Sequence, residues 1–286
     1  MAQKKRALTI KKHVDSVHIR GELSLLQRKL ANALLYHAYP DLPVKETHEI
    51  KVEHLCDLID YNSNDWATLQ DALNGLMTTT LEWGVLTDSK SRWGASTLLA
   101  GAEIRNGLCH YAYSPFLREK LYSPEVYATI NLDIQKKFGS KYGLALYENC
   151  VRYRNVGSTG WMALEVFRQL MGCDKQTYYD DFKQLNCLVI KPAVQEVNAT
   201  SDIEVTPEYK RASRKVSSVR MKIADKRNLP PLKAGKAKRN PAEGSARVAA
   251  MIDEAEARKK AAENLAAAEQ AFRDMKAVFK RGGGAA

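Results

Sequence analysis

The feature that most limits what this chain can fold into is a helical stripe followed directly by a basic, alternating segment. Four apolar residues fall on one helix face, at intervals of four, three and four: Tyr178, Phe182, Leu185 and Val189. Asp174 precedes them and is expected to be the N-cap, since its carboxylate can accept from the first free backbone N–H groups. Residues 203–223 alternate in polarity and are strongly basic, which indicates a β-hairpin. A short helix, a turn, this helix and a basic hairpin make up a winged helix-turn-helix, whose second helix enters the DNA major groove.

An ordinary amphipathic surface helix is the alternative interpretation of the stripe alone, and the basic hairpin and the flanking sequence weigh against it. The chain has 44 Lys and Arg against 33 Asp and Glu, which gives a formal net charge of +11. Such an excess favours polyanionic partners, nucleic acid before an anionic membrane surface. Pro192 lies inside the stretch and is expected to kink or divide the helix.

Cysteine usage and hydropathy predict a cytoplasmic protein. The five cysteines are scattered, with no C-x-x-C pair and no metal-ligand spacing, which favours reduced thiols: Cys56, Cys109, Cys150, Cys173 and Cys187. No apolar run is long enough to cross a bilayer, and the basic N-terminus lacks the apolar region of a secretory signal. We therefore expect no membrane partner.

The N-terminal part of the chain divides into a basic arm and the start of a folded unit. Residues 1–17 are expected to form a solvated, disordered arm, with order beginning near Val17. The alternative is an arm that touches DNA phosphates. Ser24 and Gln27 have the spacing of a capping box, which predicts a helix that runs to about Ala38.

Helices and a hairpin complete a first winged helix, predicted at residues 18–131. Helices are expected at residues 52–59 and 65–82, and a short strand at residues 83–87. Two β-type runs, residues 96–105 and 108–113, are joined by Asn106-Gly107, which is the strongest short signal for a hairpin turn. The fold class is therefore α+β, with two winged helices in tandem.

The second winged helix is predicted at residues 132–224. Helix is expected from Asp133 to Tyr153, with Gly139 and Ser140 marking a break and a new cap. Further signals are caps for the next helix at Ser158 and Thr159, a left-handed closing residue at Gly172, and strands at 202–206 and 215–223 around a basic turn. Residues 225–286 form a separate tail, in which a flexible basic linker at 226–244 precedes an Ala-rich helix at 245–281.

Several stretches resemble the iteron-binding plasmid replication initiators over about residues 18–224. The most specific are residues 140–148 (SKYGLALYE), Leu185-Asn186 followed by residues 189–198 (VIKPAVQEVN), and residues 200–215 (TSDIEVTPEYKRASRK). Weaker matches are residues 23–30 (LSLLQRKL) and the Leu81-Glu82-Trp83 sequence. The resemblance implies binding, as a monomer, to directly repeated sites in the double-stranded DNA of a plasmid origin. It also implies opening of an adjacent AT-rich duplex, and recruitment of the host initiator and the replicative helicase.

The resemblance further implies a homodimer, joined through the first winged helix, that represses the gene of the protein. It implies no chemistry on the DNA and no cofactor. We expect the hairpin at residues 98–113 to carry the dimer contacts, and its alternative is an ordinary wing on a monomer. One departure from the family is that Cys187 and Leu188 stand where basic residues are common. Cys187 is then expected to contact a thymine methyl, or Lys183 and Gln184 do more of the reading.

Candidate DNA contacts follow from side-chain chemistry. Base edges are expected to be read by the outward residues of the stretch, where Gln suits adenine and Lys suits guanine: Gln176, Lys183, Gln184 and Cys187. Phosphates are expected to be bound by cations of the helix and the hairpin: Lys191, Lys210, Arg211, Arg214 and Lys215. For each of these the alternative is plain solvent exposure. Asp180 either orients a basic neighbour or faces solvent, and the four stripe residues are expected to be core.

Two other classes of protein remain as alternatives. A winged-helix transcriptional repressor without origin function would share the basic second domain. A rolling-circle nicking enzyme would need two histidines that flank one apolar residue, and no such pair occurs among His13, His18, His37, His48, His54 and His110. There is no G-x-x-x-x-G-K-[ST] loop, and His48 and His54 lack the H-E-x-x-H spacing of a zinc protease. We therefore expect neither an enzyme nor a metal site.

Overall fold

The computed structural model describes residues 8–13, 19–20, 22–62, 65–83, 94–122 and 127–228. All of them belong to the first of two compact units, residues 1–236. The expected strand beyond residue 83, the linker beyond residue 228 and the helix at 245–281 lie outside the described residues. None of the helices in the described ranges is long and apolar enough to span a membrane.

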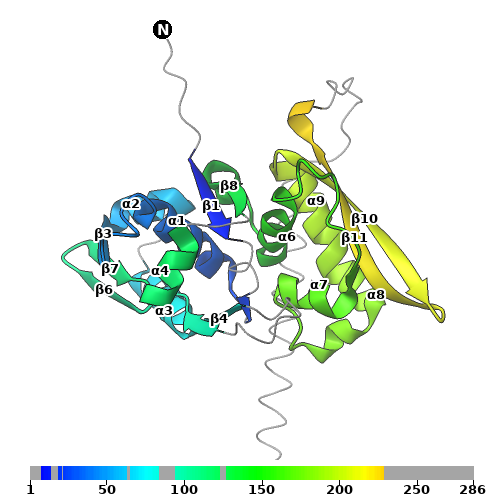
Figure 1. The fold of residues 1–286 in the computed structure, drawn as a ribbon, viewed down its shortest axis with the longest axis horizontal. Helices are drawn as coiled ribbons and strands as arrows, with labels where there is room; N and C mark the ends of the chain where they lie inside the picture. Colours follow the sequence, from blue (N-terminus) through cyan, green and yellow to red (C-terminus); the bar gives the residue numbers. More distant parts are fainter. Residues whose placement is uncertain are drawn as a thin grey trace, which may run out of the picture. The chain divides into compact units, whose positions relative to one another are not determined.

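The first winged helix forms where the helical and alternating patterns place it (Figure 1). Its elements are α1 (Leu25–Ala38), β3 (Thr47–Lys51), α2 (Val52–Ile59), α3 (Trp66–Thr78), β6 (Gly101–Arg105) and β7 (Leu108–Ala112). The capping box is confirmed, because the Ser24 hydroxyl accepts from the Gln27 N–H at 3.2 Å and the Gln27 Oε1 accepts from the Ser24 N–H at 2.8 Å. Asn106 and Gly107 turn the β6–β7 hairpin with φ of 52° and 75°, as the Asn-Gly sequence predicts.

The second winged helix repeats this order of elements. It comprises α6 (Lys141–Val151), β9 (Met162–Ala163), α7 (Leu164–Met171), the helical stretch from α8 (Phe182–Leu185) to α9 (Lys191–Thr200), β10 (Ile203–Ala212) and β11 (Lys215–Asp225). One three-stranded sheet of each winged helix contains its hairpin, with the orders β3-β7-β6 and β10-β11-β9. In both, the strand that precedes the second helix, β3 or β9, pairs with the second strand of the hairpin. Two tandem winged helices of α+β class are thereby confirmed.

One carboxylate fixes α9 on the N-terminus of α6. Glu196 is 7% exposed, and its Oε1 accepts from the backbone N–H of Gly139 at 2.6 Å and of Ser140 at 3.1 Å. Ser140 is the N-cap of α6, which confirms the predicted break between α5 (Leu132–Lys136) and α6. Burial raises the pKa of Glu196, although both N–H donors and the nearby Lys29 favour its charged form. A Cβ at Gly143 would lie 1.9 Å from Glu196 Oε2, so any side chain here would have to displace the hydrogen-bonded carboxylate.

A buried polar cluster joins α1 to α5 and α6. The Glu148 carboxylate accepts from Asn32 Nδ2 at 2.5 Å and from Arg28 Nη1 at 3.3 Å. Asn32 Nδ2 also donates to Gln135 Oε1 at 2.6 Å. These four side chains are at most 5% exposed. Buried charges are stable only when they are paired and hydrogen-bonded, and this cluster meets both conditions.

Three expectations for the first winged helix and its N-terminal arm are corrected. Order begins before Val17, because β1 (Thr9–His13) pairs with β8 (Tyr127–Asn131). The helix expected at 65–82 ends at Thr78, and β4 (Thr80–Trp83) follows, paired with β2 (Ile19–Arg20) and β5 (Gly94–Thr97). Three consecutive threonines at 78–80 explain the change, since β-branched side chains favour strand over helix. Ser96 therefore belongs to β5 and not to the β6–β7 hairpin.

One expectation for the second winged helix is also wrong. Helix α7 begins at Leu164, and its N-cap Ala163 has no side-chain hydrogen bond. Thr159 lies instead beside β11, where its N–H donates to the Met221 carbonyl and its hydroxyl accepts from the Met221 N–H, both at 3.0 Å. Gly172 ends α7 with φ of 67°, which confirms the predicted left-handed residue.

His48 is packed among aromatic rings in the core of the first unit. It is 4% exposed, and its ring centroid lies 5.5 Å from that of Tyr111 and 6.3 Å from that of Tyr113. His37 Nδ1 lies 2.9 Å from the Tyr111 hydroxyl, which also donates to the Leu34 carbonyl. Burial, followed by the neighbouring His37, lowers the pKa of His48 below the ordinary value of 6.5.

We expect Gly143→Ala to lower the free energy of unfolding by about 1–3 kcal/mol, because the methyl group overlaps the Glu196 carboxylate. Helix propensity alone predicts the opposite sign, about 1 kcal/mol of stabilisation. Urea unfolding measures the change. Gly101→Ala is the control, since no heavy atom lies within 4 Å of a Cβ there. A stabilised Gly143→Ala variant would contradict the account of this contact.

We expect stability to fall as the pH drops below about 6.5, in part through His48. The pKa of His48 is lower in the folded chain than in the unfolded chain, so below pH 6.5 the unfolded chain binds more protons and unfolding is favoured. Urea unfolding between pH 7.5 and about pH 5 should therefore show a smaller loss of stability in His48→Gln than in the wild type. Parallel pH profiles for the two proteins would refute this role.

Candidate nucleic-acid interface

The helical stretch expected to enter DNA begins later than its sequence pattern predicts. A 3-10 turn (Thr177–Asp180) comes first, and α8 starts at Phe182 with Asp181 as its N-cap. Asp181 Oδ1 accepts from the Lys183 N–H at 2.9 Å. Asp174 is therefore not the N-cap. From Phe182 the chain stays helical through a π-helical turn (Asn186–Ile190) to the end of α9 at Thr200, and we call residues 182–200 the recognition helix.

Pro192 is accommodated by the π-helical turn. Proline lacks an N–H and its ring clashes with the carbonyl four residues earlier in a regular helix. In the structure the Lys191 N–H bonds to the Asn186 carbonyl, five residues back. The wider turn replaces a regular turn directly before Pro192, and the helix continues without a break. The sequence therefore predicts the place of an irregularity, and the structure shows its kind.

The apolar stripe is only partly core. Leu185 and Val189 are fully buried, as expected, and Phe182 is half-buried with its ring centroid 5.0 Å from that of Tyr209. Tyr178 is 56% exposed, so its assignment to the core is wrong. The 3-10 turn has about three residues per turn, which breaks the helical register upstream of Phe182 and puts Tyr179 inside instead.

Three candidate contacts lie exposed on the recognition helix: Lys183, Cys187 and Lys191. Gln184 is half-buried, and its Oε1 accepts a hydrogen bond from the Tyr178 hydroxyl at 2.9 Å. Gln176 lies before the 3-10 turn, not on the helix, and its Nε2 donates to Glu22 Oε1 at 2.6 Å. The structure thus groups Gln184 with the helix cations and separates Gln176 from them.

Asp180 orients a basic side chain, one of its two expected roles. It forms an ion pair with Arg168 of α7. Arg168 Nη2 donates to the carbonyls of Asp174 at 2.9 Å and Gln176 at 3.1 Å. This arginine therefore holds α7 to the turn that leads into the recognition helix, and sequence reasoning missed it.

The hairpin is longer and its turn tighter than expected. Ser213 and Arg214 make a two-residue turn with φ of 47° and 68°, so Lys210 and Arg211 belong to β10 and Lys215 begins β11. A β-bulge lies between Lys210 and Arg211. The predicted cations at the tip are all exposed: Lys210, Arg211, Arg214 and Lys215. The long hairpin, β10 and β11, ends at this turn (Figure 1).

Trp161 supports the face of the hairpin and was missed by sequence reasoning. Lys210 Nζ lies 4.6 Å and Arg220 Cζ 4.7 Å from the Trp161 ring centroid, which are cation–π distances. Arg220 Nε also donates to Glu208 at 2.6 Å, and Lys222 pairs with Glu208 at 2.5 Å. The signal available in the sequence was a tryptophan in an otherwise polar loop. All four predicted cations are exposed, but only Lys210 is held against the Trp161 ring, and Arg211, Arg214 and Lys215 lie nearer the turn.

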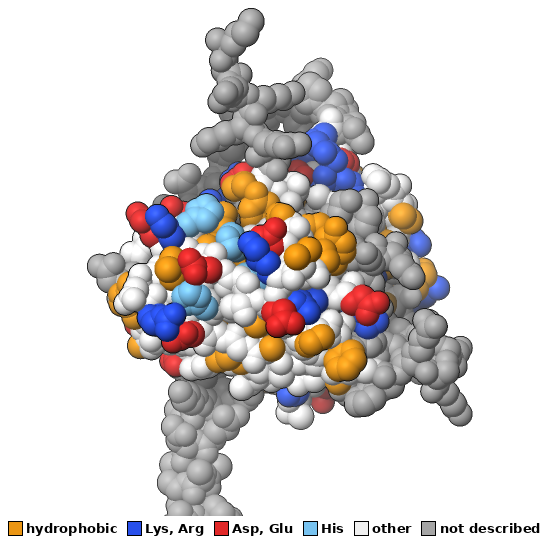
Figure 2. Space-filling model, turned by 60° about the vertical axis from the view of Figure 1, so that its left-hand side comes forward, with side chains coloured by type: hydrophobic (Ala, Val, Ile, Leu, Met, Phe, Trp, Pro, Cys, Tyr) orange, Lys and Arg blue, Asp and Glu red, His pale blue; other side chains and the backbone are white. Residues whose placement is uncertain are grey.

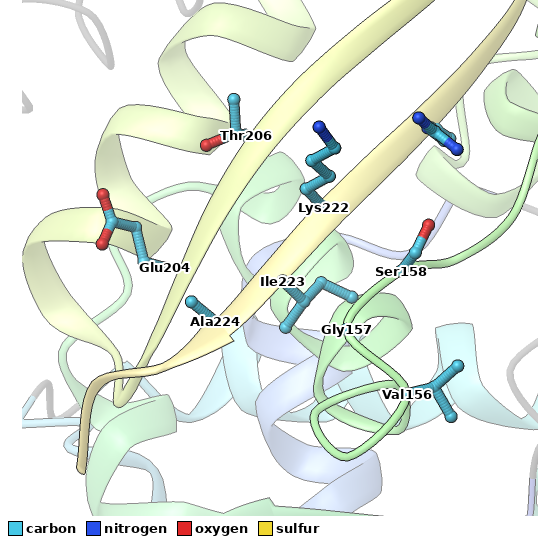
Figure 3. Close-up of a pocket in the computed structure, with 9 residues that line it drawn as sticks. Val156, Gly157, Ser158, Glu204, Thr206, Lys222, Ile223 and Ala224 are labelled. Carbon is cyan, nitrogen blue, oxygen red and sulfur yellow. The ribbon is translucent and has the colours of Figure 1, made fainter. Parts of the chain in front are cut away.

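A shallow groove of about 500 Å³ lies between this hairpin and the loop at residues 156–158 (Figure 3). Glu204, Thr206 and Lys222 extend from the strands, and Val156 and Ser158 from the loop. Its two cations are already paired with Glu208, and no predicted contact residue lines it. The groove therefore offers little free positive charge for DNA.

The equivalent helix of the first unit is chemically different. The sequence of α3, WATLQDALNGLMT, contains Asp71 but no Lys or Arg. Figure 2 shows a face on the side of the first winged helix, where acidic, basic, histidine and apolar side chains are interspersed among the described residues. The recognition helix, in contrast, exposes Lys183 and Lys191 beside a basic hairpin. Of the two helices at this position, the recognition helix is therefore better suited than α3 to bind phosphates.

Two solved structures and two family models are similar to this chain. Two crystal structures of domains 2 and 3 of RctB are similar, with 14% and 13% identity and TM-scores of 0.40 and 0.39. Each alignment covers 70% of this chain, and 82% and 81% of the RctB chains. No curated protein matches the sequence. The family model for "Initiator Replication protein, WH1" matches residues 9–151, and that for "Initiator Rep protein, WH2" matches residues 163–223. With both models matched in this order, the chain belongs to the family of replication initiator proteins with tandem winged helices.

Proposed function

We propose that this protein initiates plasmid replication in the bacterial cytoplasm by binding, as a monomer, directly repeated sites in the origin. The observation that carries the proposal is the joint presentation of an exposed recognition helix and a hairpin with a basic tip. A winged helix places the first in the major groove and the second along the phosphates. The family membership supports an origin as the target.

Within this proposal the contacts divide by chemistry. Lys183, Gln184 and Cys187 face base edges, because they lie in the first turns of the recognition helix. Lys191 and the hairpin cations bind phosphates, since exposed Lys and Arg on flexible stems suit the backbone: Lys210, Arg211, Arg214 and Lys215. Gln176 is left out of the base-reading set, because Glu22 already binds its amide.

The first winged helix has a different task in this proposal. Its α3 helix lacks cations, so the unit is better suited to protein contacts than to phosphates. We propose that its β6–β7 hairpin carries the contacts of a homodimer that represses the gene of the protein. The monomer opens the AT-rich duplex beside the repeats and recruits the host initiator and the replicative helicase.

A footprint on the DNA that flanks the gene, at near-physiological salt, tests the proposal. Protection that repeats about every two helical turns in one orientation is expected for an array of iterons, each bound by one monomer. A single inverted repeat over the promoter, with no protection elsewhere, would instead identify a dimeric winged-helix repressor without origin function. An absence of any specific protection would overturn DNA recognition by this chain.

We expect Lys191→Ala and Arg214→Ala each to weaken binding to specific and random DNA alike. Each variant should reduce the slope of log K against log salt by about one, because one phosphate contact and its released counterion are lost. Fluorescence anisotropy at several salt concentrations measures the slope. Lys137→Ala, an exposed lysine at the end of α5, is the control and should leave the slope unchanged. An unchanged slope in Lys191→Ala or Arg214→Ala removes that residue from the phosphate-binding set.

A further inference from the structure

The hydrogen bond between Tyr178 and Gln184 bears on which base the recognition helix selects. The Tyr178 hydroxyl donates to Gln184 Oε1 at 2.9 Å. Tyr178 lies in the 3-10 turn before the recognition helix and Gln184 lies in the first turn of that helix, so the bond links these two turns. Neither residue type would predict this pair from the sequence, because the helical pattern places Tyr178 in the core.

We propose that Tyr178 is a specificity-determining residue that makes Gln184 read guanine and not adenine. The proposal rests on the proposed function, in which Gln184 faces base edges. A free Gln reads adenine with both ends of its amide, because Oε1 accepts from N6 and Nε2 donates to N7. Here the phenol takes one of the two acceptor positions of Oε1, and no hydrogen bond within the described residues uses Nε2. The fixed amide then presents both N–H donors of Nε2 and only one remaining lone pair of Oε1, which suits the two adjacent acceptors of guanine, N7 and O6, better than the donor and acceptor of adenine.

Packing fixes the position from which Tyr178 acts. Its ring meets that of Tyr179 edge-on, at 5.6 Å between centroids, and Tyr179 in turn packs on Tyr142 of α6 at 6.4 Å. Tyr179 is buried, whereas Tyr178 is 56% exposed. The phenol is therefore anchored on its inner side and reaches out over the start of the recognition helix. Such a side chain can orient a neighbour before DNA arrives, which lowers the entropic cost of reading.

The other amide predicted to read bases gives the contrast. Gln176 donates through Nε2 to the Glu22 carboxylate, so one of its two donors is used inside the protein. Gln184 instead has one of its two acceptor positions used and both of its donors free. Of the two predicted glutamine readers, Gln184 is thus the better prepared for an edge of acceptors.

The test compares base preference in the wild type, Tyr178→Phe, Gln184→Ala and the double variant. A binding site is first obtained by selection from random double-stranded DNA, and each position is then changed to the other base pairs. We expect the wild type to prefer guanine over adenine at one position, and Tyr178→Phe to reduce that preference about tenfold, the scale of one base contact. Binding to random DNA and the salt slope should not change, because no phosphate contact is lost.

The double variant and a modified base distinguish action through Gln184 from direct contact. In the Gln184→Ala background, Tyr178→Phe should have no further effect on base preference. Replacing the selected guanine by 7-deazaguanine should weaken binding of the wild type but not of Gln184→Ala. Tyr209→Phe is the matched control, since its hydroxyl also donates at 2.9 Å to an amide of the recognition helix, Asn186 Oδ1. It should leave base preference unchanged.

The outcomes separate this inference from the function on which it rests. If selection returns no specific site, the proposed function fails. If a specific site is found but Tyr178→Phe keeps the wild-type preference at every position, the role of Tyr178 is overturned. A shift of equal size in the Gln184→Ala background would overturn it too, because Tyr178 would then act without Gln184.

Discussion

The contact of the Glu196 carboxylate with the N-terminus of α6 is the interaction on which the second winged helix depends. It places a negative charge where the helix dipole is positive and satisfies two backbone N–H groups. It also sets the rotation of α9, and hence of the exposed recognition face. Two residues further on, Asn198 donates to the Val205 carbonyl and accepts from the Val205 N–H, which ties the same helix to β10. Contacts from one turn of α9 thus orient both the recognition helix and the β10–β11 hairpin.

The stretches by which the sequence resembles initiators are largely contacts within the fold. Residues 140–148 contribute Ser140 and Gly143, and residues 189–198 contribute Glu196. The Glu196 carboxylate accepts from the Ser140 N–H and fits beside α6 because Gly143 has no side chain. Glu148, from the first stretch, binds Arg28 of the weaker N-terminal match. Such residues are specific because each depends on the other, and they predict the fold well. They say little about DNA sequence, which in the proposed function is read by other side chains, on the exposed face of the recognition helix.

Local patterns predicted the fold where the physical cause is local. The capping box, the Asn-Gly turn, the bounds of α2 and the left-handed Gly172 are each set by a few neighbouring residues. The pairing of β1 with β8 joins segments that are distant in sequence, and no local pattern shows it. For the candidate site, the exposed cations were predictable from the basic composition and from the helical and strand periodicity of the sequence. The exposure of Tyr178, the engagement of Gln176 and the support from Trp161 were not, because each is decided by partners from other elements.

The π-helical turn before Pro192 amounts to a regular helix with one residue inserted. Residues on its two sides are therefore not in the phase that a regular helix would give them. Deleting one residue between Asn186 and Ile190 would remove the wide turn, and it would rotate everything beyond by about 100° relative to the start. Glu196 would then leave the end of α6. At this place a single-codon deletion removes a local irregularity and, by the same step, misaligns the two halves of the recognition helix.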